Sequence, residues 1–347
     1  MRSACGSDFP HWDSDSAEIC ERIARVHSPI KILLKTKNEP FFIERWIAHH
    51  AKIVGPENLI VFDNMSDDPQ VLAVYRKWRR EVSIARFGKF WLNIHHTYLY
   101  GDLYRALATS CDYFLFLDTD EFLILMNGDQ YYRDDRIITF VEENSQYDLF
   151  PAAWLINANW SAELFSCGPQ AGDLARNLAC GKPLIRSDKI PTGFSNHNFQ
   201  LGVRLFVPPF KANLFLLHLS HLYPRQRMAA NMNKLVAAAV ATPGQSPESI
   251  ALRTDITDRI MAGYVDEIRD CLAAERASSG VATLGPGCLE LSKDAAVAYY
   301  GEAERNLITD YIADPRPVYD LIGEDYRLQS AIAANLGRPG DLGKLYI

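Results

Sequence analysis

The sequence YFLFLDTDEF, residues 113–122, joins five apolar residues directly to three carboxylates. The apolar run predicts a buried strand, and the strands of α/β sheets present reactive groups at their carboxyl ends. Because side chains alternate along a strand, Asp118 and Asp120 would point to the same side. Two carboxylates so placed repel each other unless a divalent cation lies between them. The pattern therefore predicts a metal that in turn holds a phosphate. A solvated polar turn is the alternative, and the apolar residues 122–125 that follow disfavour it.

The composition is that of a globular protein with a sizeable core. The chain has 347 residues, of which 48% are hydrophobic and 23% charged, enough for one large domain or two moderate ones. Its net charge of −7 gives no support for nucleic-acid binding. The seven cysteines include no Cys-x-x-Cys pair, which favours reduced thiols over disulfides or a zinc site.

The N-terminal residues and the hydropathy pattern predict a cytoplasmic protein. Residues 1–10 lack a basic segment followed by an apolar one, and no apolar run approaches the ~20 residues of a membrane span. Peripheral association with the inner face of the membrane stays open. The sequence does not indicate an oligomeric state.

Strand and helix signals alternate through the first half of the chain. We expect strands over 30–35, 58–62 and 82–87, and helices over 40–53, 69–80 and 92–110. Such alternation predicts an α/β fold with a mostly parallel sheet flanked by helices. Residues 148–221 are rich in strand and loop signals. Beyond them the pattern is helical, over 225–241, 249–275, 293–313 and 317–336.

Three segments, in this order and spacing, resemble the nucleotide-binding motifs of GT-A glycosyltransferases, most closely the family-2-like and family-92-like groups. They are Lys37-Asn38-Glu39 before an amphipathic helix, Ile60 to Asp68, and Phe116 to Leu123. Lys37 stands where the family often has Arg. Weaker similarities follow at Asn159-Trp160, Phe165 to Gly168, Lys182 to Arg186, His197, and His221 to Tyr223. The resemblance covers residues 30–234.

The resemblance implies a GT-A (Rossmann-like) nucleotide-diphospho-sugar transferase fold with a helical C-terminal region. We expect an N-terminal extension over 1–28, a catalytic domain over 29–223 and helices over 224–347. The catalytic domain would divide into a nucleotide-binding half, 29–125, and an acceptor half, 126–223. The implied reaction moves a sugar, hexosyltransferase-like and with inversion, from a nucleotide-diphosphate sugar to a hydroxyl of a glycan or glycoconjugate, as in polysaccharide biosynthesis. UDP-sugar is the default donor.

The resemblance also assigns roles to the motif residues. Asp120 would bind Mn²⁺ or Mg²⁺ directly, and Asp118 would contact the ribose, or the metal through water. A further metal ligand would be a His, for which His218 and His221 are candidates and His221 is preferred. Asp63 would recognise the base, and the nucleoside pocket would include Thr36, Lys37, Asn38 and Glu39. Lys182 and Arg186 would clamp the diphosphate, with ordinary solvated charge as the alternative for both.

An inverting reaction needs a base within hydrogen-bond reach of the acceptor hydroxyl. Glu163 ranks first by its place in the chain, followed by Asp188 and His197. Trp154 and Trp160 would stack on acceptor sugars, or belong to the core.

Two other functions remain as alternatives at this point. One is an Asp-nucleophile phosphatase of the haloacid-dehalogenase type, against which Phe122 stands where that family has Thr or Val. The other is a non-catalytic nucleotide-sugar-binding protein on the same fold.

Overall fold

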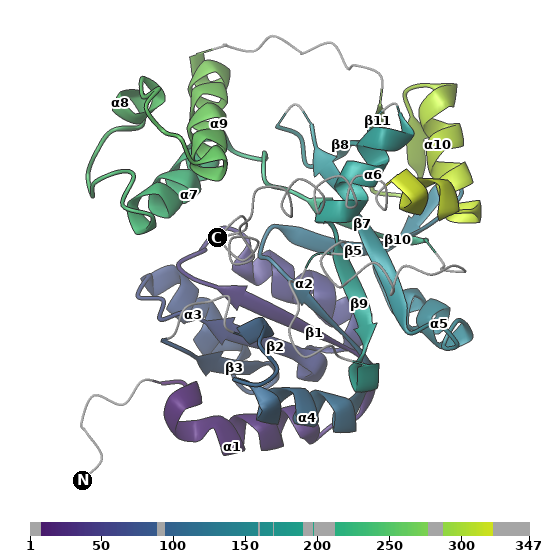
Figure 1. Cartoon of the computed structure of the whole chain (residues 1–347). Coiled ribbons are helices and arrows are strands. Elements are labelled where there is room, and N and C mark those ends of the chain that lie inside the picture. Colours follow the sequence, from purple (N-terminus) through teal and green to yellow (C-terminus); the bar gives the residue numbers. More distant parts are fainter. Residues whose placement is uncertain are drawn as a thin grey trace, which may run out of the picture.

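A sheet of 12 strands organises the part of the chain that the computed structural model describes, residues 8–88, 94–158, 160–168, 170–189, 197, 212–276 and 287–321 (Figure 1). The strand order is β12-β11-β8-β7-β9-β4-β1-β2-β3, and β5, β6 and β10 pair off this path. The predicted fold class, α/β with a mostly parallel central sheet, is confirmed.

The parallel part of the sheet contains β1 (Ser28–Thr36), β2 (Leu59–Asp63), β3 (Ser83–Arg86) and β4 (Cys111–Leu117). β1 lies between β2 and β4, and all of these pairings are parallel. The register sets Thr36 beside Asp63 and Leu34 beside Leu117. The polar residues that end β1, β2 and β4 therefore meet at one edge, where α/β sheets bind ligands.

Helices cover both faces of this sheet, because successive apolar side chains of a strand point to opposite faces and both faces need to be buried. Ile32 and Leu34 belong to a core shared with α2 (Ile43–Val54), α3 (Pro69–Trp78) and α5 (Arg136–Glu143). Leu33 belongs to a second core, shared with α1 (Trp12–Ala24) and α4 (Gly101–Ser110). Helix α1, within the segment expected to be an extension, thus packs on the sheet (Figure 1).

The second half adds antiparallel strands beside β4. β9 (Lys182–Arg186) is antiparallel to both β4 and β7 (Leu149–Asn157). β10 (Leu214–His218) runs parallel to β7 and antiparallel to β5 (Glu121–Asn127), which also pairs with β6 (Gln130–Tyr132). Helix α6 (Ala171–Cys180) contributes to the core beside them. Only residues 118–120 separate β4 from β5, so the acidic motif forms the corner between two strands with different partners.

The C-terminal third departs from the expected run of helices. α7 (Pro224–Ala237), α8 (Pro247–Ala251) and α9 (Arg259–Arg276) form a cluster of their own, so the helix expected over 249–275 is divided in two. The helix expected over 293–313 is also shorter, since β11 (Cys288–Leu291) and β12 (Val297–Tyr299) precede α10 (Glu302–Ala313). These two strands form a hairpin that adds to β8 (Leu164–Ser166), and this pairing outweighs local helix preference.

Two other expected helices differ at their ends. The helix expected over 92–110 begins only at Gly101 in the described residues, and most of 317–336 lies outside them. Every helix in the described ranges is too short or too polar to span a bilayer.

Candidate active site

The acidic corner, residues 118–121, presents two of its three carboxylates to solvent. The side chains of Asp118 and Asp120 are 41% and 23% exposed, whereas Glu121 is completely buried. The Leu219 N–H donates to the Asp120 carbonyl at 2.8 Å and so ties the corner to the end of β10. Asp118 and Asp120 are therefore available to a ligand, and Glu121 lies beneath them.

A buried lysine lies against the corner. Lys182, at the start of β9, is 1% exposed, and its Nζ is 2.8 Å from Asp118 Oδ2 and 3.7 Å from Glu121 Oε1. Burial acts to raise the pKa of Asp118, but Lys182, followed by Lys35, lowers it below its ordinary value. Burial acts to lower the pKa of Lys182, and Asp118 and Glu121 raise it instead. Both groups are thus charged at neutral pH, and the ammonium fixes the Asp118 carboxylate.

Glu121 holds the corner in shape from below. Its Oε2 accepts the Asp118 backbone N–H at 2.8 Å, and its Oε1 accepts the Trp154 Nε1–H at 2.7 Å. Burial raises the pKa of Glu121, with Lys182 acting in the opposite direction. With both oxygens committed to protein donors and no exposed surface, Glu121 positions its neighbours and does not reach a ligand.

The histidine beside Asp120 is His218, the last residue of β10. The antiparallel register pairs His218 with Glu121, which brings its Nε2 to 3.5 Å from Asp120 Oδ2. Trp154 stacks on the His218 ring with centroids 4.3 Å apart. Burial acts to raise the pKa of Asp120, but His218 lowers it to about 2, so the carboxylate is charged near neutral pH.

Among the described residues, no three His, Cys, Asp or Glu side chains already have the mutual geometry of a metal centre. The pair of Asp120 and His218 nevertheless fits a divalent cation. Two ligands about 2.1 Å from one ion, at right angles, are about 3 Å apart, and these donor atoms are separated by 3.5 Å. Mn²⁺ and Mg²⁺ favour carboxylate ligands, and Asp118 is accessible at the same corner.

Three more basic side chains, Lys35, His95 and His197, lie within electrostatic range of Asp118. Lys35, near the end of β1, is 6% exposed, and its Nζ is 2.8 Å from His95 Nε2. Burial lowers the pKa of Lys35 to about 7 and that of His95 well below its ordinary value. His197 Nδ1 is 2.6 Å from the Cys180 carbonyl oxygen, and burial, followed by Lys182, lowers its pKa to about 3. Both imidazoles are therefore neutral at physiological pH.

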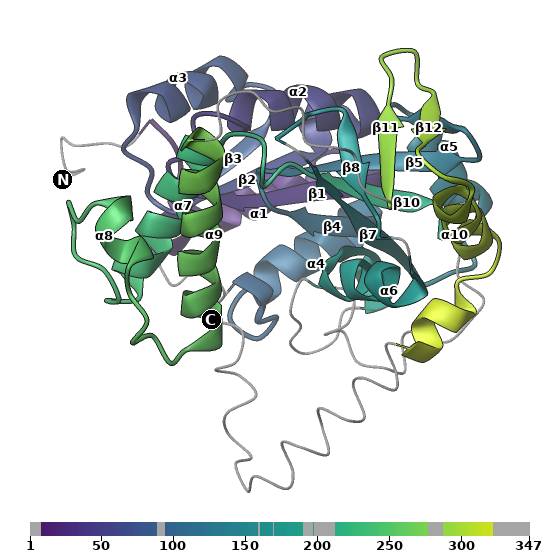
Figure 2. The same cartoon turned by 90° about the horizontal axis from the view of Figure 1, so that it is seen from above.

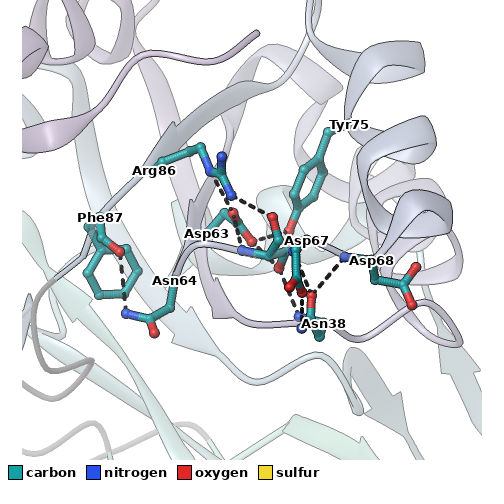
Figure 3. A network of polar contacts seen from close by, with 9 residues as sticks. Asn38, Asp63, Asn64, Asp67, Asp68, Tyr75, Arg86 and Phe87 are labelled. Atoms are coloured by element: carbon teal, nitrogen blue, oxygen red, sulfur yellow. Dashed lines mark hydrogen bonds and ion pairs between the residues drawn. The ribbon is translucent and has the colours of Figure 1, made fainter. Parts of the chain in front are cut away.

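The residue expected to recognise a base, Asp63, is enclosed by protein donors (Figure 3). It has no exposed surface. Its Oδ2 accepts from the Ser66 backbone N–H at 2.9 Å and from Arg86 Nε at 3.2 Å. Its Oδ1 accepts from the Ser66 and Tyr75 hydroxyls. The carboxylate therefore holds β2, β3 and α3 together at this edge.

Asn38 joins the ends of β1 and β2 (Figure 3). Its φ of 47° lies in the left-handed region that Asn tolerates better than most residues. Its Oδ1 accepts the backbone N–H groups of Asp67 and Asp68 at 2.9 and 3.1 Å, and its own N–H donates to Ser66 Oγ at 2.8 Å. Asn38 is thus a structural link between the two loops expected to surround the nucleoside.

The remaining residues of the predicted nucleoside pocket differ in position. Thr36 is buried, and its carbonyl accepts the Asn64 N–H at 2.8 Å. Lys37 is exposed. Glu39 is partly buried, and its pKa is raised by burial and then by the charge of Asp120, which places its carboxylate within electrostatic range of the corner.

The structure does not bring Arg186 and Asp188 to the corner. Arg186 ends β9 and pairs with Tyr113 at the start of β4, four residues before Leu117 and hence about 13 Å along the strand. There it forms ion pairs with Asp188 at 3.1 Å and Asp148 at 3.9 Å. Both residues therefore lie toward the opposite end of β4 from Asp118.

Glu163 and His221 contact residues other than the carboxylates. Glu163 is exposed beside β8, and its carbonyl accepts the Leu291 N–H at 2.8 Å. The His221 N–H donates to Asn157 Oδ1 at 2.8 Å, and its ring lies edge-on to Trp160 at 5.9 Å. Burial, followed by the charge of Arg227, lowers the pKa of His221.

The sequence pattern does not single out Lys35 or His95, and it favours His221 over His218 as a metal ligand, whereas His218 is the histidine beside Asp120 in the structure. One signal was present for Lys35, because an ionisable residue within the apolar run of a central strand is seldom buried without a partner. His95 carries no such signal, since its position depends on a distant contact with Lys35.

We predict that Asp63→Asn lowers the free energy of unfolding by about 3 kcal/mol, because it leaves the largely buried Arg86 guanidinium without its carboxylate. Denaturant unfolding measures the change, and Asp112→Asn, at a 59% exposed position, is the control with the same loss of charge. If Asp63 instead recognised the base of a nucleotide, Asp63→Asn would alter the nucleotide preference and leave the free energy of unfolding unchanged.

The depressed pKa of Lys35 predicts a pH dependence of stability. Between its folded value of about 7 and its ordinary value of 10.5, the unfolded chain binds a proton that the folded protein does not. Stability therefore rises with pH in this window. Relative to Lys35→Met, the wild-type free energy of unfolding should increase by about 1 kcal/mol per pH unit above pH 7. The exposed Lys52→Met is the control, and a pH-independent difference for Lys35→Met contradicts the assignment.

No protein-family model and no curated protein matches the sequence. The chain is similar to a solved structure of S. aureus TarS 1–349, with 12% identity over 79% of this chain and 97% of that chain and a TM-score of 0.33. The same TarS segment in complex with UDP gives 11% identity over 77% and 98%, with a TM-score of 0.34. A mannosyltransferase, PcManGT from Pyrobaculum calidifontis in complex with GDP-Man and Mn²⁺, gives 12% over 78% and 85%, with a TM-score of 0.34. Likenesses this weak carry no argument about activity, so function rests on the residues of the site.

Proposed function

We propose that the chain is a metal-dependent glycosyltransferase that uses a nucleotide-diphosphate sugar, with UDP as the default nucleotide. The observation that carries the proposal is the corner itself: Asp118 and Asp120 are accessible and charged where β1, β2 and β4 end, and the buried Lys182 supports them. The catalytic domain that we propose spans 29–223. Hydroxyl groups of a glycan or glycoconjugate would be the acceptors.

The charges at the corner favour an anionic ligand held through a cation. Two accessible carboxylates alone would repel a diphosphate, so a divalent ion is needed between them and the ligand. We infer that Asp120 and His218 hold Mn²⁺ or Mg²⁺, with Asp118 at the same corner. When bound, the metal neutralises the charge of the leaving diphosphate.

The role we propose for Lys182 differs from a direct diphosphate clamp. Its side chain is 1% exposed and its ammonium is already paired with Asp118, so it offers almost no surface to a ligand. We infer that Lys182 acts on the ligand through Asp118, keeping that carboxylate ionised and in one orientation. Its effect on donor binding would then appear as weaker positioning, not as loss of a direct phosphate contact.

Of the three candidate bases, His197 is the one that lies near the corner. Its ring is 5.7 Å from that of Trp154, and the charges of Lys182 and Asp118 both act on its pKa. An Nδ1–H donated to the Cys180 carbonyl leaves the Nε2 lone pair free to accept a hydrogen bond. We propose that His197 Nε2 accepts the hydrogen bond of the acceptor hydroxyl.

Thermal shifts with UDP, GDP and CMP and their sugars, with and without Mn²⁺, test the proposal. We expect stabilisation by one class of nucleoside diphosphate and only with the metal. Asp120→Asn should abolish that stabilisation and reduce transfer about a hundredfold or more, because it removes a charged metal ligand. Asp188→Asn, remote and exposed, is the control. No response to any nucleotide in the wild-type protein would refute the glycosyltransferase.

The two histidines near the corner give a matched pair of variants. We predict that His218→Ala weakens Mn²⁺ binding by about 10–100-fold, as expected on losing a group beside the ion. His221→Ala should change it little, because the His221 ring contacts Trp160 rather than Asp120. Calorimetric titration with Mn²⁺ distinguishes the two variants. A larger effect of His221→Ala would contradict the role of His218 and favour His221, the metal ligand expected from the sequence.

A further inference from the structure

The helical cluster formed by α7, α8 and α9 is connected directly to the acidic corner. Figures 1 and 2 show these helices grouped on one side of the molecule, away from α5 and α10. Beyond His218, which contacts Asp120, the chain passes through His221 and enters α7 at Pro224. Trp160 lies against His221 and also packs on the core of the helical cluster. The segment from His218 to Pro224 thus links the residue beside Asp120 to these helices.

One face of α7 carries three polar side chains toward α9. Arg227, Asn231 and Lys234 are spaced i, i+4 and i+7, so they lie along the same face of the helix. Arg227 forms an ion pair with Glu267 at 2.6 Å, and the Asn231 amide donates to the same carboxylate at 2.7 Å. These two residues are therefore committed to fastening α7 to α9.

Lys234 differs from its two neighbours on this face. Its Nζ lies 4.7 Å from the centroid of the Tyr264 ring, and no carboxylate of the described residues is within ion-pair distance. The side chain keeps exposed surface. Burial, followed by the charge of Arg227, lowers the pKa of Lys234, and the charges of Asp120, Glu267 and Asp118 act to raise it. The acidic corner is therefore within electrostatic range of an ammonium that solvent can reach.

We propose that Lys234, supported on Tyr264, binds a phosphoryl group of the ligand held at Asp118 and Asp120. The inference deepens the proposed function, on which it rests. The Tyr264 ring contacts the ammonium without consuming its N–H donors as a carboxylate would. A lysine so placed offers a compact charge to a phosphate oxygen, as lysines in other phosphate sites do. The phosphate would belong either to the nucleoside diphosphate or to an anionic acceptor.

Calorimetric titrations of wild type and Lys234→Met with UDP and GDP in the presence of Mn²⁺ test the proposal, with uridine and guanosine as phosphate-free controls. A second arm titrates inorganic phosphate into protein already saturated with the diphosphate. Arg225→Met is the matched variant, since it removes one positive charge from the same helix at an 88% exposed side chain paired with Glu275. Lys234→Arg tests rescue, and the melting temperature of each variant verifies folding.

If the group is the donor diphosphate, Lys234→Met weakens UDP or GDP binding about tenfold or more, as for loss of a charge-assisted hydrogen bond, and leaves nucleoside binding unchanged. If it belongs to the acceptor, diphosphate binding is unchanged and the second arm is weakened. Arg225→Met has neither effect, and Lys234→Arg restores most of the loss. Equal affinities of wild type and Lys234→Met in both arms overturn the proposal.

The outcome is separable from that of the proposed function. If the wild-type protein binds neither nucleoside diphosphate, the glycosyltransferase proposal fails. Inorganic pyrophosphate with Mn²⁺ then still decides the role of Lys234. Weaker binding in Lys234→Met supports a phosphate site, and equal binding in wild type and variant refutes it.

Discussion

The buried ion pair between Lys182 and Asp118 is the interaction on which the rest of the site depends. An ammonium that is 1% exposed is tolerated only beside compensating charge, and the carboxylates of Asp118 and Glu121 provide it. The pair joins the start of β9 to the corner that follows β4. β4 and β9 are antiparallel neighbours in the sheet. Removal of Lys182 would leave neighbouring carboxylates without their buried cation, and removal of Asp118 would leave the ammonium only Glu121, at 3.7 Å. The pair therefore favours one arrangement of the corner.

That arrangement separates a supporting layer from a reactive one. Glu121 and Lys182 are inaccessible and bonded to protein groups, whereas Asp118 and Asp120 keep exposed surface. Trp154 connects the layers, since it donates to Glu121 and stacks on His218. Side chains fixed from below by hydrogen bonds and packing present their oxygens with little loss of rotamer entropy on binding, which favours a cation of strict geometry.

The sequence predicted the parts of this structure that depend on local pattern. Apolar runs interrupted by amphipathic helices predicted the parallel strands, and the spacing of Asp118 and Asp120 predicted the acidic strand end. The sequence pattern could not predict the parts that depend on contacts between residues far apart in the chain. Lys182 meets Asp118 across 64 residues of chain. His218 rather than His221 adjoins Asp120 because β10 pairs with β5 in one register. The β11–β12 hairpin likewise depends on the edge of β8, which no local signal reveals.

The network around Asp63 limits which atoms would be free to recognise a nucleoside under the proposed function. Its carboxylate already accepts four protein donors, and the Asn38 amide oxygen accepts two more. A base N–H would have to displace one of these donors, and exchanging one hydrogen bond for another gives little net free energy. If the proposed function holds, the two side chains would contribute to binding by keeping the ends of β1 and β2 in register. Selectivity among bases would then arise from main-chain groups and from the shape of this edge, and affinity chiefly from the charges at the corner.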